Sequence, residues 1–145
     1  LPHREPSIGI NSFLYCSSLT CITIPNSVTA IGINAFRICT SLTGITIPNS
    51  VTSIGRSAFQ NCTNLSSITI PDSVNSIGND AFYNCTNLTS AQFDGEAPSI
   101  GPEAFENTQD SYTIEGAANA ANYGGDGATY GGIVEVDYSG TATRS

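Results

Sequence analysis

The sequence predicts a repeat solenoid, an α/β stack of 23-residue units with a parallel β-sheet, short helical turns and a β-containing C-terminal cap. Two observations predict this fold class. One pattern of apolar residues recurs about five times at a constant spacing of 23 residues. Each unit also combines a short stretch of helical spacing with a stretch of strand-like alternation. With 145 residues, of which 39 % are hydrophobic, the chain is large enough to bury a core.

Columns of equivalent residues define the repeat. The isoleucine and phenylalanine columns are Ile8, Ile31, Ile54, Ile77, Ile100 and Phe13, Phe36, Phe59, Phe82, Phe105. The cysteine and leucine columns are Cys16, Cys39, Cys62, Cys85 and Leu19, Leu42, Leu65, Leu88. Residues 31–53 and 54–76 are identical at 14 of 23 positions, so we expect the units to share one backbone path.

The second unit illustrates the elements expected in each repeat. Four of its residues follow the i, i+3/i+4, i+7 spacing of a short helical turn: Ala35, Phe36, Cys39 and Leu42. Ile45 and Ile47 then alternate with Thr46, which predicts a strand. Stacked units should pair these strands in parallel about 4.8 Å apart and share one continuous core.

A corner and a return segment should close each unit. Pro48 lacks an amide donor and ends the strand, and Pro-Asn-Ser predicts a turn. Val51 and Ile54 should face inward on the return segment, and Gly55 should allow a tight turn into the next unit.

The recurring motif I-G-x-x-A-F-x-x-C-x-x-L-x-x-I-x-I-P resembles the BspA-like, or Treponema pallidum type, leucine-rich repeat. Leu42–Gly55 and Cys62–Gly78 carry the match most clearly, and the resemblance covers about residues 7–110. It implies an α/β leucine-rich repeat fold in an extracellular or cell-surface protein that adheres or binds partners. It implies no enzyme activity and specifies no ligand.

Decay of the repeat marks the expected domain boundaries. We expect an N-terminal extension over residues 1–6, the leucine-rich repeat solenoid over 7–110, and a C-terminal cap or docking tail over 111–145. The tail contains a predicted strand over 133–138, which either covers the last rung or pairs with another copy. Because the chain begins at Leu1 and contains no Met, we expect a processed product or a fragment.

Charge excludes several classes of function. Only 11 % of the residues are charged, there is no lysine, and the net charge is −8. A nucleic-acid binder or a polybasic membrane-surface module needs a basic patch, which this chain lacks. No apolar run approaches the roughly 20 residues of a transmembrane helix, so no membrane insertion is expected.

The charges are also unevenly placed. Nine of the twelve acidic residues lie within 94–145, and three of the four arginines lie within 1–56. Attraction between the acidic C-terminal end of one copy and the more basic N-terminal end of another favours head-to-tail self-assembly into filaments. Because little chain precedes the first repeat, we also expect that repeat to be poorly covered, which favours the same contact. The alternatives are a solvated acidic cap and a longer chain before Leu1.

Catalysis, cofactors and metal binding have no support in the sequence. His3 is the single histidine, and without lysine neither a Ser-His-Asp nor a Ser-Lys arrangement is available within the repeats. The cysteine column should be buried and flat, which is not a metal-ligand geometry, although the spacing of stacked rungs also permits disulfide pairing. Cys21 stands where other units have Gly or Ser, so it is a candidate exposed thiol.

Two sets of polar residues are candidate sites. The outward strand positions predict a binding surface on the concave face of the sheet: Thr23, Thr46, Thr69 and Gln92. This column is one residue wide, which disfavours ice binding. Four asparagines lie in N-x-S/T sequons and are candidate glycosylation sites or turn residues: Asn61, Asn64, Asn84 and Asn87.

Two functions therefore remain open from the sequence. One is a non-enzymatic extracellular structural or adhesive protein whose partner is a second copy of itself. The alternative is a monomeric surface module that recognises a host protein or glycan through its concave face.

Overall fold

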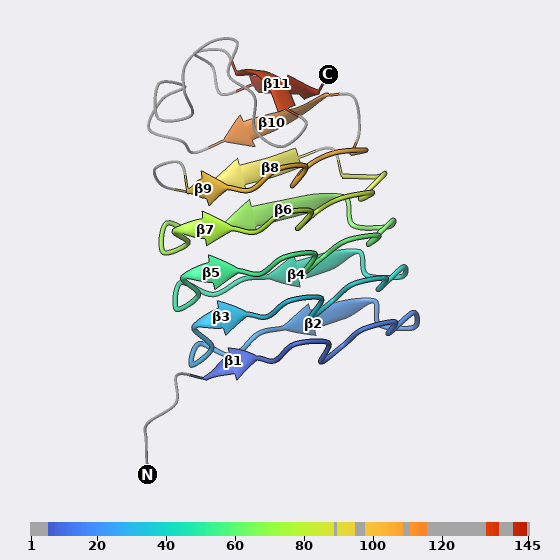
Figure 1. Cartoon of the computed structure of the whole chain (residues 1–145), viewed down its shortest axis with the longest axis vertical. Coiled ribbons are helices and arrows are strands. Elements are labelled where there is room, and N and C mark those ends of the chain that lie inside the picture. Colours follow the sequence, from blue (N-terminus) through green and yellow to red (C-terminus); the bar gives the residue numbers. More distant parts are fainter. Residues whose placement is uncertain are drawn as a thin grey trace.

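The computed structural model of the chain describes residues 6–88, 90–94, 98–108, 111–115, 133–136 and 141–144. These residues form a stack of flattened coils that rises along one axis, from β1 at one end to β10 and β11 at the other (Figure 1). Each coil advances the chain by 23 residues, as the repeat predicts.

Each coil contributes strands to two rows rather than to one sheet. The first row is β1 (Ser7–Ile8), β3 (Ala30–Ile31), β5 (Ser53–Ile54), β7 (Ser76–Ile77) and β9 (Ser99–Ile100). The second row is β2 (Cys21–Thr23), β4 (Gly44–Thr46), β6 (Ser67–Ile70), β8 (Ser90–Phe93) and β10 (Ser111–Glu115). The second row pairs as β2–β4 and as β6–β8–β10, with β4 packed beside β6. The strands of the two rows point in opposite directions along the two long walls of the coil (Figure 1).

The parallel register keeps equivalent residues side by side. Ile31 lies opposite Ile54, and Ile54 lies opposite Ile77. The predicted corner at Pro48 is confirmed as a turn, closed by a hydrogen bond of 3.1 Å from the Val51 N–H to the Pro48 carbonyl. Ser73 Oγ donates to the Val51 carbonyl at 2.6 Å and ties one corner to the next.

The helical turns predicted over residues 35–42 are wrong, because this segment is a series of β-turns. The N–H groups of Ala35, Arg37 and Cys39 each bond to the carbonyl three residues earlier, at 3.2 Å. The intervening N–H groups donate to carbonyls of the next coil. The Phe36 N–H, for example, donates to the Ala58 carbonyl at 2.8 Å. A helix would keep all of these donors within its own segment.

Left-handed residues make these turns. In the second coil Asn34 and Ile38 have φ values of 58° and 62°. The same two positions are left-handed in every described coil: Asn11, Ser57, Asp80 and Glu103 in one column, and Tyr15, Asn61, Asn84 and Asn107 in the other. Each left-handed residue reverses the chain within a turn, so alternate amides face the neighbouring coil.

A stack of phenylalanine rings runs through the core. The rings of the phenylalanine column lie parallel within 7°, with centroids 5.1–5.3 Å apart. Phe36, Phe59, Phe82 and Phe105 are fully buried. Phe93 meets Phe105 edge-on at 6.4 Å near the last coil. This contact joins the core of the second strand row to the ring stack.

The first coil is less covered than the others. Ile8, Phe13, Leu19 and Ile22 are only partly buried, whereas their equivalents in the third coil are buried. Nearby Ile10 and Tyr15 expose 65 % and 64 % of their surface. Among the described residues, the apolar side chains of the first coil are therefore the least covered.

The other end of the second row is antiparallel. β12 (Thr141–Arg144) pairs antiparallel with β10, and β11 (Ile133–Val136) pairs antiparallel with β12. β10 itself pairs in parallel with β8 at the repeat spacing, since Thr113 lies opposite Ser90. The domain boundary at residue 110 remains a prediction, and much of the predicted N-terminal extension and tail lies outside the described residues.

The glycine column marks the closest approach between coils. A Cβ atom on Gly55 would lie 2.8–2.9 Å from backbone atoms of Gly32, Ile33 and Ile31, and one on Gly78 would lie 2.6 Å from the Arg56 nitrogen. Gly55 is therefore required for close packing, rather than for the tight turn that the sequence predicts. Gly44 differs, because a Cβ there would meet nothing within 4 Å.

We expect Gly55→Ala to lower the free energy of unfolding by about 1–3 kcal/mol, because the added methyl overlaps the backbone of the previous coil. The measurement is urea unfolding followed by circular dichroism. Gly44→Ala is the matched control and should change stability by about 0.5 kcal/mol or less. Equal stability of the two variants would contradict the close-packing role.

Candidate binding surface

Three threonines form an exposed column on the second strand row. Thr23 and Thr46 lie opposite each other in the β2–β4 pair, and Thr69 holds the equivalent place in β6. All three are exposed, whereas Ile47 and Ile70, one residue further on, are buried. Because strand residues alternate between faces, the buried isoleucines fix the threonines outward.

Gln92, the fourth predicted member, differs from the threonines. It lies opposite Thr69 in the β6–β8 pair and is half-buried. Its Nε2 donates to Asp94 Oδ1 at 2.8 Å, so the amide already has a partner. The column therefore consists of three accessible threonine side chains followed by a glutamine whose amide is already hydrogen-bonded to Asp94.

A second column of small residues flanks the threonines. Cys21 is exposed and lies opposite Gly44, and Ser67 is exposed on β6. We define the threonine face by these two columns: Cys21, Gly44 and Ser67 with Thr23, Thr46 and Thr69. None of its residues is charged, and all are small, so its surface has low relief.

The sequon asparagines have structural roles on the edge of the turn segments. Asn61 and Asn84 hold left-handed positions, with φ values of 63° and 60°, which Asn tolerates better than most residues. Asn87 Nδ2 donates to Asn64 Oδ1 at 3.5 Å. Because Nδ2 is the atom that carries an N-linked glycan, glycans on both Asn64 and Asn87 would crowd each other. Glycosylation of these residues remains a prediction.

The buried cysteines form a column of thiol hydrogen bonds. The Sγ atoms of Cys39, Cys62 and Cys85 each donate to the carbonyl of a phenylalanine in the previous coil, at 3.1 Å. The acceptors are Phe13, Phe36 and Phe59. All five cysteines are free, and Cys16 is half-buried.

Burial keeps the column protonated. It raises the pKa of Cys39 from 9.0 to about 11 and that of Cys85 to about 12. Burial also raises the pKa of Cys62, with smaller contributions from Cys85 and Cys39. Because the thiolate is the reactive form, these three thiols are inert near neutral pH.

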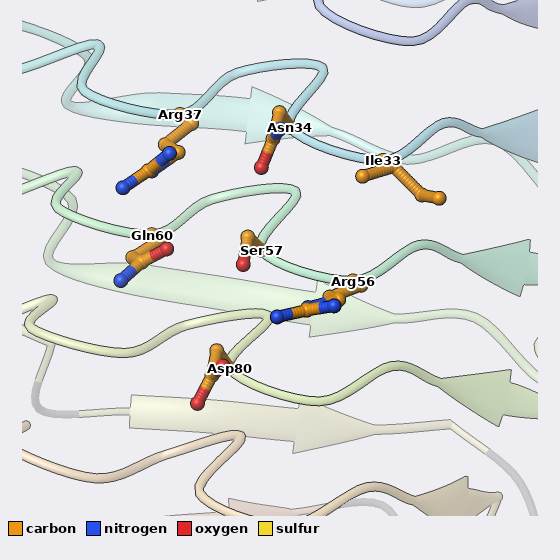
Figure 2. Close-up of a pocket in the computed structure, with 7 residues that line it drawn as sticks. All are labelled: Ile33, Asn34, Arg37, Arg56, Ser57, Gln60 and Asp80. Atoms are coloured by element: carbon orange, nitrogen blue, oxygen red, sulfur yellow. The ribbon is translucent and has the colours of Figure 1, made fainter.

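A shallow depression of about 450 Å³ lies on the turn segments. Figure 2 shows Arg37 above Gln60 on successive coils, and Arg56 reaching across toward Ser57 and Asp80. Asn34 and Ile33 complete its lining. The turn segments that carry it lie in front of the second-row strands in Figure 2. Because the threonines of those strands point away from the buried core, the depression opens on the wall opposite the threonine face.

Sequence reasoning missed this depression because its residues occupy the variable positions of the repeat. Arg37 and Arg56 are 19 residues apart, and only stacking at 23 residues brings them to one site. A signal was present, since Arg56 and Ile33 are equivalent positions and Arg37 lies one β-turn beyond Ile33.

Other classes of site are not observed where the structure describes the chain. Within those residues no three His, Cys, Asp or Glu side chains converge as metal ligands. His3 lies outside them. No helix in the described part is long and apolar enough to cross a membrane.

Family comparison agrees with the repeat geometry. A sequence model of the BspA type leucine rich repeat region matches residues 6–124 in six copies. The chain belongs to the BspA-type leucine-rich repeat family. Members of this family are repeat scaffolds, and its repeat is generally used for protein–protein interaction. No curated protein matches the chain significantly.

Solved structures carry the same fold. The Treponema pallidum leucine rich repeat protein (TpLRR) is 33 % identical with a TM-score of 0.64, over 70 % of this chain and 47 % of that one. A leucine rich cell surface protein from Faecalibacterium prausnitzii is 27 % identical with a TM-score of 0.69, and the match covers 86 % of this chain and 33 % of that protein. A leucine-rich repeat protein from Bacteroides ovatus is 28 % identical with a TM-score of 0.55, and the match covers 74 % of this chain and 33 % of that protein. The BspA-type chain thus spans between a third and a half of these relatives.

Thiol labelling tests the cysteine geometry of this BspA-type chain. At pH 8 we expect an aromatic disulfide reagent to modify Cys21 rapidly and Cys16 more slowly, because their exposure differs. Cys39, Cys62 and Cys85 should react only after denaturation, and raising the pH to 9 should not release them. Peptide mass mapping identifies the labelled sites. Cys21→Ser should remove the fast phase, and rapid native labelling of Cys62 would contradict the buried column.

Proposed function

We propose that this chain is a non-enzymatic cell-surface or extracellular scaffold that binds a partner protein through its threonine face. The single observation that carries this proposal is the exposed column of Thr23, Thr46 and Thr69 on the second strand row, where β2 pairs with β4 and β4 packs beside β6. Such a surface is present before binding, so little ordering cost opposes association.

The chemistry of the face favours a protein partner. Interface centres are depleted in charged residues, and this face has none. Threonine presents a methyl group and a hydroxyl together, so the column offers both apolar contact and hydrogen bonding about every 4.8 Å along the stack. The partner protein would lie across several coils, because no single coil presents more than two of these side chains.

A location outside the cell is supported by family and relatives. The relative from Faecalibacterium prausnitzii is described as a cell surface protein, at 27 % identity. The absence of lysine and the low charged fraction suit a structural surface repeat rather than a nucleic-acid binder. Adhesion through the threonine face would be the resulting activity.

We expect the double variant Thr46→Arg, Thr69→Arg to abolish partner binding. Two arginines would place bulky, hydrated charges at the centre of the face, and truncation or blocking of such a centre typically weakens binding by tenfold or more. The measurement is surface plasmon resonance against a panel of purified extracellular proteins, with a glycan array run in parallel.

Asn75→Arg is the control, because Asn75 is exposed beside β7 in the other strand row. It should bind like the unmodified chain. Unchanged binding by the double variant would exclude the threonine face. Binding to glycans alone, lost in the same double variant, would replace the protein partner by a saccharide.

A second candidate function is head-to-tail self-assembly, which the half-covered first coil favours. Ile8, Phe13 and Leu19 are partly buried there, and Ile10 and Tyr15 are exposed. In the order of the second row, β2 and β11 are the outermost strands. Pairing of β11 with β2 of the next copy would cover the first coil and extend the sheet, which gives an open filament.

For this second function we expect assembly that grows with concentration and is lost in the double variant Ile10→Glu, Tyr15→Glu. Both side chains are exposed, so charge at these positions should oppose association without disturbing the core. Light scattering after size exclusion, with negative-stain microscopy, gives the measurement. A strictly monomeric chain at about 1 mM would exclude self-assembly.

A further inference from the structure

The depression on the turn segments gathers the basic side chains of the described coils. Arg37 and Arg56 both line it, in a chain whose net charge is −8. Among the described residues, neither guanidinium lies within 4.0 Å of a carboxylate oxygen. Two cations thus line one depression, and neither forms a direct ion pair with Asp80, the acidic residue that lines it with them.

Arg37 also has a hydrogen-bond donor without an acceptor. Its Nε atom is shielded from solvent and has no hydrogen-bond partner. A buried donor without an acceptor costs free energy, and a charged one costs more than a neutral one. Arg37 therefore carries hydrogen-bonding capacity that the free protein does not satisfy.

We propose that this depression binds the carboxylate of an acidic saccharide, a uronic or sialic acid residue. Guanidinium groups match a carboxylate in shape and charge, and Arg56 and Arg37 supply two of them. A volume of about 450 Å³ falls within the usual range for small-ligand sites. This site lies on the wall opposite the threonine face and is independent of the function proposed above.

The rest of the lining selects a saccharide rather than a bare anion. The Ser57 hydroxyl and the Asn34 and Gln60 amides offer both donors and acceptors for ring hydroxyls. Ile33, which exposes 42 % of its surface, offers an apolar wall for the C–H face of a pyranose ring. These groups come from two successive coils, so the pocket exists only in the stacked fold.

Asp80 lowers the positive charge of the depression and adds a hydrogen-bond acceptor. Its carboxylate lines the same depression, which leaves a net charge of +1 when both arginines are counted. This net positive charge attracts a dianion such as sulfate more strongly than a monoanion, so the preference for a saccharide rests on hydrogen bonds to its hydroxyl groups. Asp80 also accepts hydrogen bonds from ring hydroxyls, which a bare inorganic anion lacks.

Isothermal titration tests the proposal with trigalacturonate and sialyllactose as probes, each compared with its methyl ester. We expect at least one acid to bind and its methyl ester to bind at least tenfold more weakly. Esterification removes the negative charge of the carboxylate that the arginine guanidinium groups would bind. Arg56→Gln should weaken binding of that acid at least tenfold. Arg56 is exposed, so this variant should fold normally, as circular dichroism would show.

Asn75→Asp is the matched control, since it changes the net charge by the same amount at an exposed position outside the depression. It should bind within twofold of the unmodified chain. Asp80→Asn should narrow the preference for the acidic saccharide over inorganic sulfate. Equal binding of acid and ester, no effect of Arg56→Gln, inorganic sulfate binding as tightly as the saccharides, or no binding of either acid at millimolar concentration would each overturn the proposal.

Discussion

The backbone register between coils is the constraint on which the rest of the structure depends. Each coil satisfies half of its turn amides within itself and half on its neighbour, as Phe36 does on Ala58 and Phe59 does on Ala81. This exchange requires coils close enough that Gly55 and Gly78 have no room for a side chain. Once the coils are held at that distance, the phenylalanine rings, the thiols and the corner hydroxyls all meet their equivalents one repeat away. Stability is therefore additive over neighbours, as in other solenoids.

The sequence predicts the columns of this stack more readily than the backbone between them. A spacing of 23 residues identifies the buried phenylalanine, leucine and cysteine positions directly, because stacking places equivalent residues together. The turn segments are different. A helical turn and a series of β-turns both point residues 35, 36, 39 and 42 inward, so side-chain spacing does not separate them. Asn34 is a usual left-handed residue, but Ile38 is not, and here the amide pairing between coils overrides local preference.

Of the two candidate surfaces, one follows from the sequence pattern and the other does not. Alternation along the second strand row is enough to predict that Thr23, Thr46 and Thr69 face outward. The arginine-lined depression has no such pattern, because it is assembled from variable positions of adjacent coils. One wall thus repeats a uniform chemistry along its length, while the other carries residues that differ from coil to coil. A repeat protein of this kind can change its recognition on one wall without altering the other.

The thiol column determines which cysteines of the folded chain an oxidant can reach. A chain with several cysteines on one stack could form misplaced disulfides wherever its thiols were accessible. Here three thiols lie within the core, each with its proton directed at a phenylalanine carbonyl. Burial within the folded stack protects these three thiols from thiol–disulfide exchange. Cys21 alone is exposed among the cysteines, so it is the thiol most open to oxidation.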